Sequence, residues 1–272
     1  MTATHAPART AVLSLSGVSK AFGAVQALKD ITFDVHAGEV HALVGDNGAG
    51  KSTLVKTIAG VYTPDSGRMV FAGRPVSVSS PGEAQRLGIA TVFQDLALCD
   101  NLDVVANLFL GRESHRGPAL DEVSMEQESW RLLRQLSAKI PSVRIPVASL
   151  SGGQRQTVAI ARSLLGDPKV VMLDEPTAAL GVAQTAEVLN LVERLRENGL
   201  AVILISHNMS DVMAVADRVT VLRLGRNNGT FAVAETSAEQ VIAAITGATS
   251  NAVTERASRS LHKDHPGQEQ QR

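Results

Sequence analysis

The chain has 272 residues, of which 44% are apolar and 19% charged, with a formal net charge of −1; this length allows a substantial hydrophobic core in one large domain or two small ones. The near-neutral charge gives no support for a nucleic-acid partner or an anionic membrane surface. Cys99 is the single cysteine, which excludes an intramolecular disulfide framework and fits a reducing compartment.

The sequence does not predict a membrane-spanning or secreted chain. It contains no run of about eighteen apolar residues. Residues 1–9 lack the apolar core of a secretory signal. We therefore expect the protein to stay in the cytoplasm and to meet a membrane only through a partner.

The N-terminal part predicts short strands joined by turns. Apolar and polar residues alternate over residues 12–15 and again over 31–35. A turn is expected at residues 37–38, and a further hairpin over 68–78 with its turn at 73–75.

A glycine-rich segment follows the apolar run 39–44 and matches G-x-x-x-x-G-K-[ST], the loop that wraps nucleotide phosphates. Its glycines allow backbone N–H groups to face the phosphates. Lys51 is predicted to reach the β- and γ-phosphates, and Ser52 to ligate Mg²⁺. A helix is expected from about Lys51 to the stop at Gly60, which completes the strand–loop–helix setting of the motif. The predicted phosphate-binding residues are Gly45, Asp46, Asn47, Gly48, Ala49, Gly50, Lys51, Ser52 and Thr53.

Helical periodicity with charged faces dominates from about residue 94 to 165 and predicts a helical insertion in an α/β body. Trp130 is expected to anchor its local core rather than to stack on a ligand. Ser151, Gly152, Gly153 and Gln154 open a further helix expected over 154–165. Taken by itself, this serine-glycine turn is an ordinary helix N-cap. In a chain that also contains a phosphate loop, it is a candidate for a second helix N-terminus that binds an anion.

The α/β pattern returns after Lys169. The apolar run 170–173 predicts a buried parallel strand that ends at Asp174 and Glu175. These adjacent carboxylates either face solvent without a role, or, beside a phosphate loop, hold Mg²⁺ (Asp174) and polarise the attacking water (Glu175).

The last third predicts a strand–helix–strand unit and a hairpin. The helix is expected over 182–198 and the second buried strand over 201–205. A hairpin is expected over 219–233 with its turn at 227–229. Residues 247–272 are polar and are expected to be disordered. The expected apolar face of the helix is formed by Val188, Leu189, Val192 and Leu195.

The sequence Leu-Ser-Gly-Gly-Gln at 150–154, with the phosphate loop, resembles the signature of ATP-binding cassette (ABC) transporter subunits. The resemblance covers nearly all of residues 11–246. It implies an α/β fold: a P-loop NTPase core with a mostly parallel sheet, an N-terminal antiparallel β subdomain and an inserted α-helical subdomain at about 95–165. It also implies ATP and Mg²⁺ as cofactors. Two subunits would pack head to tail, so that Ser151, Gly152, Gly153 and Gln154 of one act on the ATP held by the other.

The same resemblance assigns roles to three further residues. Phe22 corresponds to the aromatic residue that stacks on adenine, although it could also be a buried strand residue. Gln94 corresponds to the glutamine that links Mg²⁺ and the lytic water to the helical subdomain, and His207 to the histidine that contacts the γ-phosphate. The implied catalytic residues are therefore Glu175, His207, Lys51 and Gln94, and the implied metal ligands are Ser52, Gln94 and Asp174. Gly181 stands where the family usually has an aspartate that signals across the dimer.

The segments around the phosphate loop, Gly181 and His207 are similar to ATPases of bacterial monosaccharide importers of the ribose, xylose and fructose type. This similarity implies a homodimer on the cytoplasmic face of the membrane, bound to polytopic permease subunits and served indirectly by an extracytoplasmic sugar-binding protein. The alternatives are an ABC ATPase for another cargo, or a soluble ABC ATPase acting on ribosomes or DNA. A nucleic-acid partner is not expected, because the chain carries no excess of basic residues.

Overall fold

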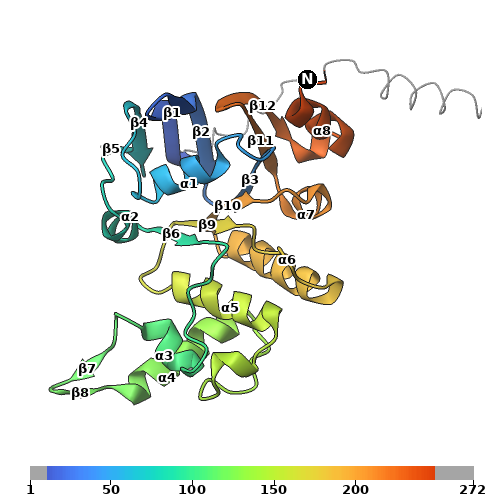
Figure 1. The fold of residues 1–272 in the computed structure, drawn as a ribbon. Helices are drawn as coiled ribbons and strands as arrows, with labels where there is room; N and C mark the ends of the chain where they lie inside the picture. Colours follow the sequence, from blue (N-terminus) through green and yellow to red (C-terminus); the bar gives the residue numbers. More distant parts are fainter. Residues whose placement is uncertain (1–10, 249–272) are drawn as a thin grey trace, which may run out of the picture.

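The computed structural model describes residues 11–248 and confirms the predicted fold class. Two sheets and the helices around them form an α/β body, and helices α3, α4 and α5 form a separate part in the lower half of Figure 1. The family bounds 11–246 and the helical subdomain at 95–165 remain predictions. Of the tail expected to be disordered, residues 249–272 lie outside the described residues.

The elements follow one another in the order drawn in Figure 1. The strands are β1 (Ala11–Phe22), β2 (Val25–His36), β3 (Glu39–Gly45), β4 (Ser66–Phe71), β5 (Arg74–Val76), β6 (Ile89–Val92), β7 (His115–Arg116), β8 (Ala119–Leu120), β9 (Val170–Asp174), β10 (Ala201–Ile205), β11 (Arg218–Arg223) and β12 (Arg226–Ala232). The α-helices are α1 (Lys51–Ile58), α2 (Pro81–Leu87), α3 (Val104–Phe109), α4 (Glu122–Gln135), α5 (Gly152–Ser163), α6 (Val182–Glu197), α7 (Met209–Val215) and α8 (Ala238–Thr246). Short 3₁₀ helices cover Val147–Ser149 and Val233–Glu235.

The central sheet has the strand order β12-β11-β3-β10-β9-β6, and its strands from β11 to β6 are parallel. Strands β9 and β10 correspond to the two apolar runs predicted as buried strands. They are buried on both faces, because successive side chains enter different cores. Met172 and Ile203 belong to the core under α1, whereas Val171 and Val202 belong to the core under α5 and α6. The predicted parallel crossovers are confirmed.

The antiparallel sheet has the order β2-β1-β4-β5 and shares one core with α1. Leu13 and Phe33 from this sheet are buried together with Leu54 and Ile58 from the helix. This shared core fixes the phosphate-binding helix between the two sheets.

The helical part also contains the short hairpin β7–β8, where we expected helix only. Gly117, at φ +66°, and Pro118 lie between its two strands; glycine adopts this backbone conformation readily and proline disfavours a continuing helix. Trp130 is only partly buried, although it packs against the core of the helical part. On α6, Leu191 is buried, and Leu189, which we placed on the apolar face, is only partly so.

The turn between β11 and β12 lies at Leu224 and Gly225, not at the predicted Asn-Asn-Gly segment, which belongs to β12. Gly225 donates its N–H to Ala49 O and accepts from Lys29 N. A Cβ at Gly225 would lie 2.7 Å from Ala27 O. The close approach of the phosphate loop therefore selects the position of this turn.

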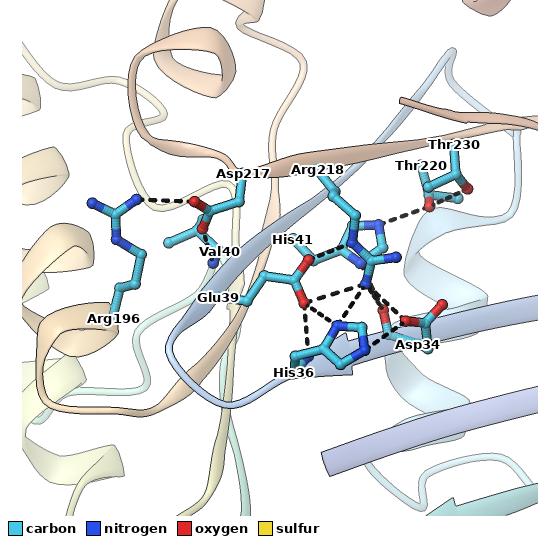
Figure 2. Close-up of polar contacts among 10 residues, drawn as sticks. All are labelled: Asp34, His36, Glu39, Val40, His41, Arg196, Asp217, Arg218, Thr220 and Thr230. Carbon is cyan, nitrogen blue, oxygen red and sulfur yellow. Dashed lines mark hydrogen bonds and ion pairs between the residues drawn. The ribbon is translucent and has the colours of Figure 1, made fainter. Parts of the chain in front are cut away.

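A polar cluster at the amino end of β3 joins three strands (Figure 2). Arg218 on β11 donates from Nε to Glu39 Oε1 at 2.5 Å and from Nη2 to Asp34 Oδ2 at 2.7 Å. Burial disfavours the charge of Glu39, but the hydrogen bonds from Arg218 and from the His36 N–H outweigh it and lower the pKa of Glu39. The cluster fastens the antiparallel sheet to the central one.

His41 lies next to this cluster but is fully buried. Its Nδ1 is 2.6 Å from Asp34 O and its Nε2 is 2.8 Å from Thr220 Oγ1. Burial first, and then the charge of Arg218, lower the pKa of His41 to about 4. This histidine is therefore neutral at physiological pH, and its role is structural: it links Asp34 on β2 to Thr220 on β11.

Candidate nucleotide-binding site

The predicted site residues from four parts of the chain follow the carboxyl ends of adjacent parallel strands. Strand β6 pairs Val92 with Leu173, and β9 pairs Asp174 with Ile205 of β10, which in turn pairs with Leu43 of β3. Since neighbouring parallel strands end at the same edge, the residues after them lie along one edge of the sheet. Ligands of open α/β sheets bind at this kind of edge. The residues in question are Gln94 after β6, Asp174 and Glu175 at β9, His207 after β10 and segment 45–53 after β3.

The phosphate loop has the backbone shape that the motif requires. Gly45, Gly48 and Gly50 have φ values of +152°, +78° and +105°. A Cβ on Gly50 would lie 2.7 Å from Ala27 O, so both the conformation and the space demand glycine. Gly50 is the N-cap of α1, and the first turn of that helix has neither a side-chain cap nor an acidic residue. Its N–H groups and dipole therefore remain available to an anion.

Lys51 turns back across the loop. Its Nζ donates to Gly45 O at 2.7 Å and to Asp46 O at 3.1 Å. Asp46 in turn accepts the N–H of Asn47 through Oδ1 at 2.7 Å. Ser52, the next residue of α1, is exposed. The loop thus presents an ammonium group and a free hydroxyl at the start of the same helix.

The two adjacent carboxylates have different surroundings. Asp174 is partly buried; burial, and then the charge of Glu175, raise its pKa, while Lys51 and Lys56 oppose this shift. Glu175 has a left-handed backbone (φ +51°), uncommon for a residue with a side chain, and donates its N–H to Ile205 O at 2.9 Å. The two carboxylates therefore differ in their neighbours: Asp174 is influenced by Lys51 and Lys56, whereas Glu175 contacts His207.

His207 meets Glu175 directly. Its Nδ1 lies 2.8 Å from Glu175 Oε2, and its side chain is 72% exposed, against 15% for that of Glu175. Thr177 Oγ1, in the loop after Glu175, donates to Asp211 Oδ2 on α7 at 2.7 Å. The loop after β9 and the helix after His207 are therefore tied together at two points.

Phe22 and Gln94 are both exposed at the ends of their strands. The side chain of Phe22 is 43% exposed, which excludes the alternative of a buried strand aromatic. Its ring packs edge-on against that of Tyr62, with centroids 5.0 Å apart. We did not anticipate Tyr62; the available signal was that the only tyrosine of the chain follows the glycine stop of α1 by two residues.

The serine-glycine turn forms the predicted helix start, two residues earlier than expected. Ser151 Oγ accepts from Gln154 N at 3.3 Å, and Gln154 Oε1 accepts from Ser151 N at 3.0 Å, which is a capping box. Gln154 Nε2 also donates to Lys139 O at 2.9 Å. In Figure 1, α5, which begins at this turn, and α1, which begins at the phosphate loop, lie in different halves of the molecule.

The glycines of this turn lie against the loop that follows Glu175. A Cβ on Gly152 would lie 3.0 Å from Leu180 Cδ2, and one on Gly153 would lie 3.3 Å from Gln184 Cβ. Gly181 is the N-cap of α6 with an ordinary φ of −73°, and its N–H is accepted by Gln184 Oε1 at 3.3 Å. Neither backbone nor space requires glycine at position 181.

The oxygen atoms at the edge suit a magnesium ion shared with phosphates. Within the described part of the chain, no group of three or more His, Cys, Asp and Glu side chains could hold a metal by itself. Mg²⁺ typically takes one or two carboxylates and completes its shell with water and phosphate oxygens. A partly buried Asp174 with a raised pKa, near the hydroxyl-bearing start of α1, fits this need.

Comparison with known proteins identifies the family. Residues 28–178 match the family described as ABC transporter. The chain is 46% identical over 215 residues to the xylose/arabinose import ATP-binding protein XylG of Sulfolobus acidocaldarius, covering 79% of this chain and 86% of that protein. It is 42% identical over 249 residues to the fructose import ATP-binding protein FrcA of Rhizobium meliloti, covering 89% and 96%. The chain therefore belongs to the ABC transporter family.

Some relatives are longer. The putative ribose/galactose/methyl galactoside import ATP-binding protein 2 of Burkholderia cenocepacia is 42% identical over 238 residues, and the chain spans about half of it (46%). Among solved structures, the cassette MJ1267 in its ADP conformation has a TM-score of 0.75 at 26% identity, covering 87% of this chain and 95% of that one. The dimeric cassette MJ0796 bound to ADP and Pi has a TM-score of 0.68 at 25% identity, covering 81% and 98%. The fold is thus that of an ABC ATPase cassette, a class in which dimers occur.

Proposed function

We propose that this chain is the ATP-hydrolysing subunit of a monosaccharide importer and works as a homodimer with separate membrane subunits. The observation that carries the proposal is the single sheet edge at which the phosphate loop, Asp174, Glu175 and His207 meet. The likeness to the xylose/arabinose and fructose import ATP-binding proteins supports a monosaccharide as cargo.

In this proposal, the phosphate loop and Lys51 hold the β- and γ-phosphates of ATP. Glu175 is the general base in this proposal, and its contact with the histidine expected to bind the γ-phosphate supports that role. Ser52, Asp174 and Gln94 would hold Mg²⁺, which neutralises charge that develops on the phosphates. Catalysis is then mainly positioning and charge stabilisation.

The second copy completes the site. Helices α1 and α5 lie in different halves of the molecule (Figure 1), and α5 begins with an exposed, capped N-terminus. In a head-to-tail dimer, this helix end of one copy would face the γ-phosphate held by the other. ATP contacts both copies only in the closed dimer, and this differential affinity drives closure.

Phe93 and Asp95, the residues on either side of Gln94, line a hollow of about 380 Å³ between the α/β body and the helical part. We assign this hollow to the contact with the membrane subunits. None of the helices within residues 11–248 has the length and apolar character to cross a bilayer. The proposed location is therefore the cytoplasmic face of the membrane, through the permease. The lining includes Phe93, Asp95, Leu96, Arg112 and Arg162.

Uptake assays in cells test this function. Cells lacking the gene should lose uptake of one radiolabelled monosaccharide from a panel of ribose, xylose, fructose and galactose. The wild-type gene should restore uptake, and the Glu175→Gln gene should not. Unchanged uptake of every sugar, with lost uptake of an amino acid instead, would contradict the sugar assignment. Purification of the tagged chain from detergent with no polytopic subunit would contradict the transport role.

A further inference from the structure

Phe22, proposed to stack on adenine, has an aromatic neighbour and a cationic one. The ring of Tyr62 meets it at an interplanar angle of 71° with centroids 5.0 Å apart. Lys20 Nζ lies over the Phe22 ring, 5.6 Å from its centroid. With 43% of the side chain exposed, part of the ring still faces solvent.

Both neighbours are held in place by the chain around them. Lys20 Nζ donates to Asp65 Oδ1 at 2.8 Å, and Asp65 Oδ2 accepts the N–H of Ala21 at 2.7 Å. The Asp65 N–H donates to Ser19 O at 2.8 Å. Asp65 thus fixes the ammonium group and the strand that carries Phe22 at the same time.

Tyr62 lies four residues after the end of the phosphate-binding helix, α1. Its N–H donates to Lys56 O at 3.2 Å, and Lys56 Nζ lies 5.9 Å from the centroid of its ring. Since Lys51 begins this helix, one short helix joins the phosphate loop to the aromatic pair. The position of the Tyr62 ring is therefore linked, through α1, to the loop proposed to bind the phosphates.

We propose that Tyr62, with the Lys20–Asp65 pair, is a positioning set that holds the Phe22 ring so that its exposed face takes a purine base. This inference rests on the proposed ATPase function. It adds residues that hold the adenine-binding ring in position. Stacking on a ring that is already immobilised costs less conformational entropy than stacking on a free side chain. An edge-to-face partner and a cation over the ring supply that immobilisation.

The test separates binding of the base from binding of the phosphates. Dissociation constants for ATP and for inorganic tripolyphosphate are measured by calorimetry, with magnesium present, for the wild type, Tyr62→Ala, Tyr62→Leu and Tyr62→Phe. The first two variants should bind ATP about two- to tenfold more weakly, which is the range of one edge-to-face pair. Their affinity for tripolyphosphate should stay unchanged. Tyr62→Phe, which keeps the ring, should match the wild type for both ligands.

Kinetics give a second readout that a merely structural role would not produce. In Tyr62→Leu, the KM for ATP should rise while kcat stays the same, because the phosphate end is untouched. Tyr62→Leu keeps a larger apolar side chain than alanine at this position and keeps the test valid if Tyr62→Ala fails to fold. Wild-type ATP affinity in Tyr62→Leu would overturn the proposal, as would an equal loss for ATP and tripolyphosphate. A wild-type chain that binds neither ligand would instead overturn the proposed ATPase function itself.

Discussion

Nδ1 of His207 lies 2.8 Å from Oε2 of Glu175, so the two side chains proposed to act on the γ-phosphate and on the attacking water contact each other. Glu175 is held by a strained backbone at the end of β9, whereas the imidazole projects into solvent. In the proposed reaction the water sits beside the carboxylate and the phosphate beside the imidazole.

Glu175→Gln should retain ATP binding and lose turnover. Removing a general base typically lowers kcat by about 10²- to 10⁴-fold, and the closed ATP dimer should accumulate because hydrolysis no longer opens it. Steady-state ATPase assays and light scattering after gel filtration measure the two effects. Glu197→Gln, an exposed change near the end of α6, is the matched control and should behave as wild type. Full ATPase activity in Glu175→Gln would remove Glu175 from the base role.

Lys51→Ala should weaken ATP binding by about 10- to 100-fold, the range expected for loss of a charge-assisted hydrogen bond. Fluorescence titration with an ATP analogue measures this change. Lys29→Ala also removes a lysine, but from an exposed position whose recorded hydrogen bond comes from the backbone N–H. An ATP dissociation constant in Lys51→Ala equal to that of the control would mean that the phosphate loop is misidentified.

Gly225→Ala should destabilise the protein, whereas Gly181→Ala should not. Gly225 has φ +74°, and a Cβ there would meet Ala27 O at 2.7 Å, while a Cβ at Gly181 meets nothing within 4 Å. The left-handed conformation alone costs a residue with a Cβ about 1–2 kcal/mol, which lowers Tm by roughly 2–8 °C for a domain of this size. Thermal unfolding followed by circular dichroism measures both variants. Equal melting temperatures would show that the turn can move away from the phosphate loop without cost.

His41 should make the protein less stable as the pH falls from about 7 to 4. Its pKa is about 4 in the folded protein and about 6.5 in an unfolded chain. Between these values the unfolded chain binds a proton that the folded protein does not, so the free energy of unfolding decreases by up to about 3 kcal/mol as the pH falls through this window.

Urea unfolding at several pH values measures this dependence. His41→Gln keeps hydrogen-bonding groups but does not titrate, so its free energy of unfolding should depend less on pH over the same range. The remaining histidines are common to both proteins and contribute equally. Parallel pH profiles for the wild type and His41→Gln would contradict the role of burial at His41.

The features that were predicted correctly from the sequence are those that depend on neighbouring residues in the chain. The phosphate loop combines glycines with positive φ and a helix start, and β9 and β10 are short apolar runs that no helix pattern fits. The carboxyl ends of such strands share an edge in any parallel sheet, so the grouping of Asp174, Glu175 and His207 followed from chain order and strand type.

Features set by contacts between distant segments could not be read from the sequence. The turn at Leu224 and Gly225 is chosen by the approach of Ala27 and Ala49, although Asn-Asn-Gly is the stronger local turn signal. The pairing of Tyr62 with Phe22 joins the end of α1 to the tip of β1, forty residues apart in number. In both cases the local sequence does not specify which distant segment it meets.

The strand that feeds the phosphate loop, β3, is paired on one side by β10 and on the other by β11. Both of these neighbours lie more than 150 residues further along the chain. During synthesis, a nascent polypeptide that ends before Ala201 leaves β3 without either neighbour, and its backbone polar groups lack the partners they have in the finished sheet. Competence to bind a nucleotide thus arises only once the chain has been made as far as β11.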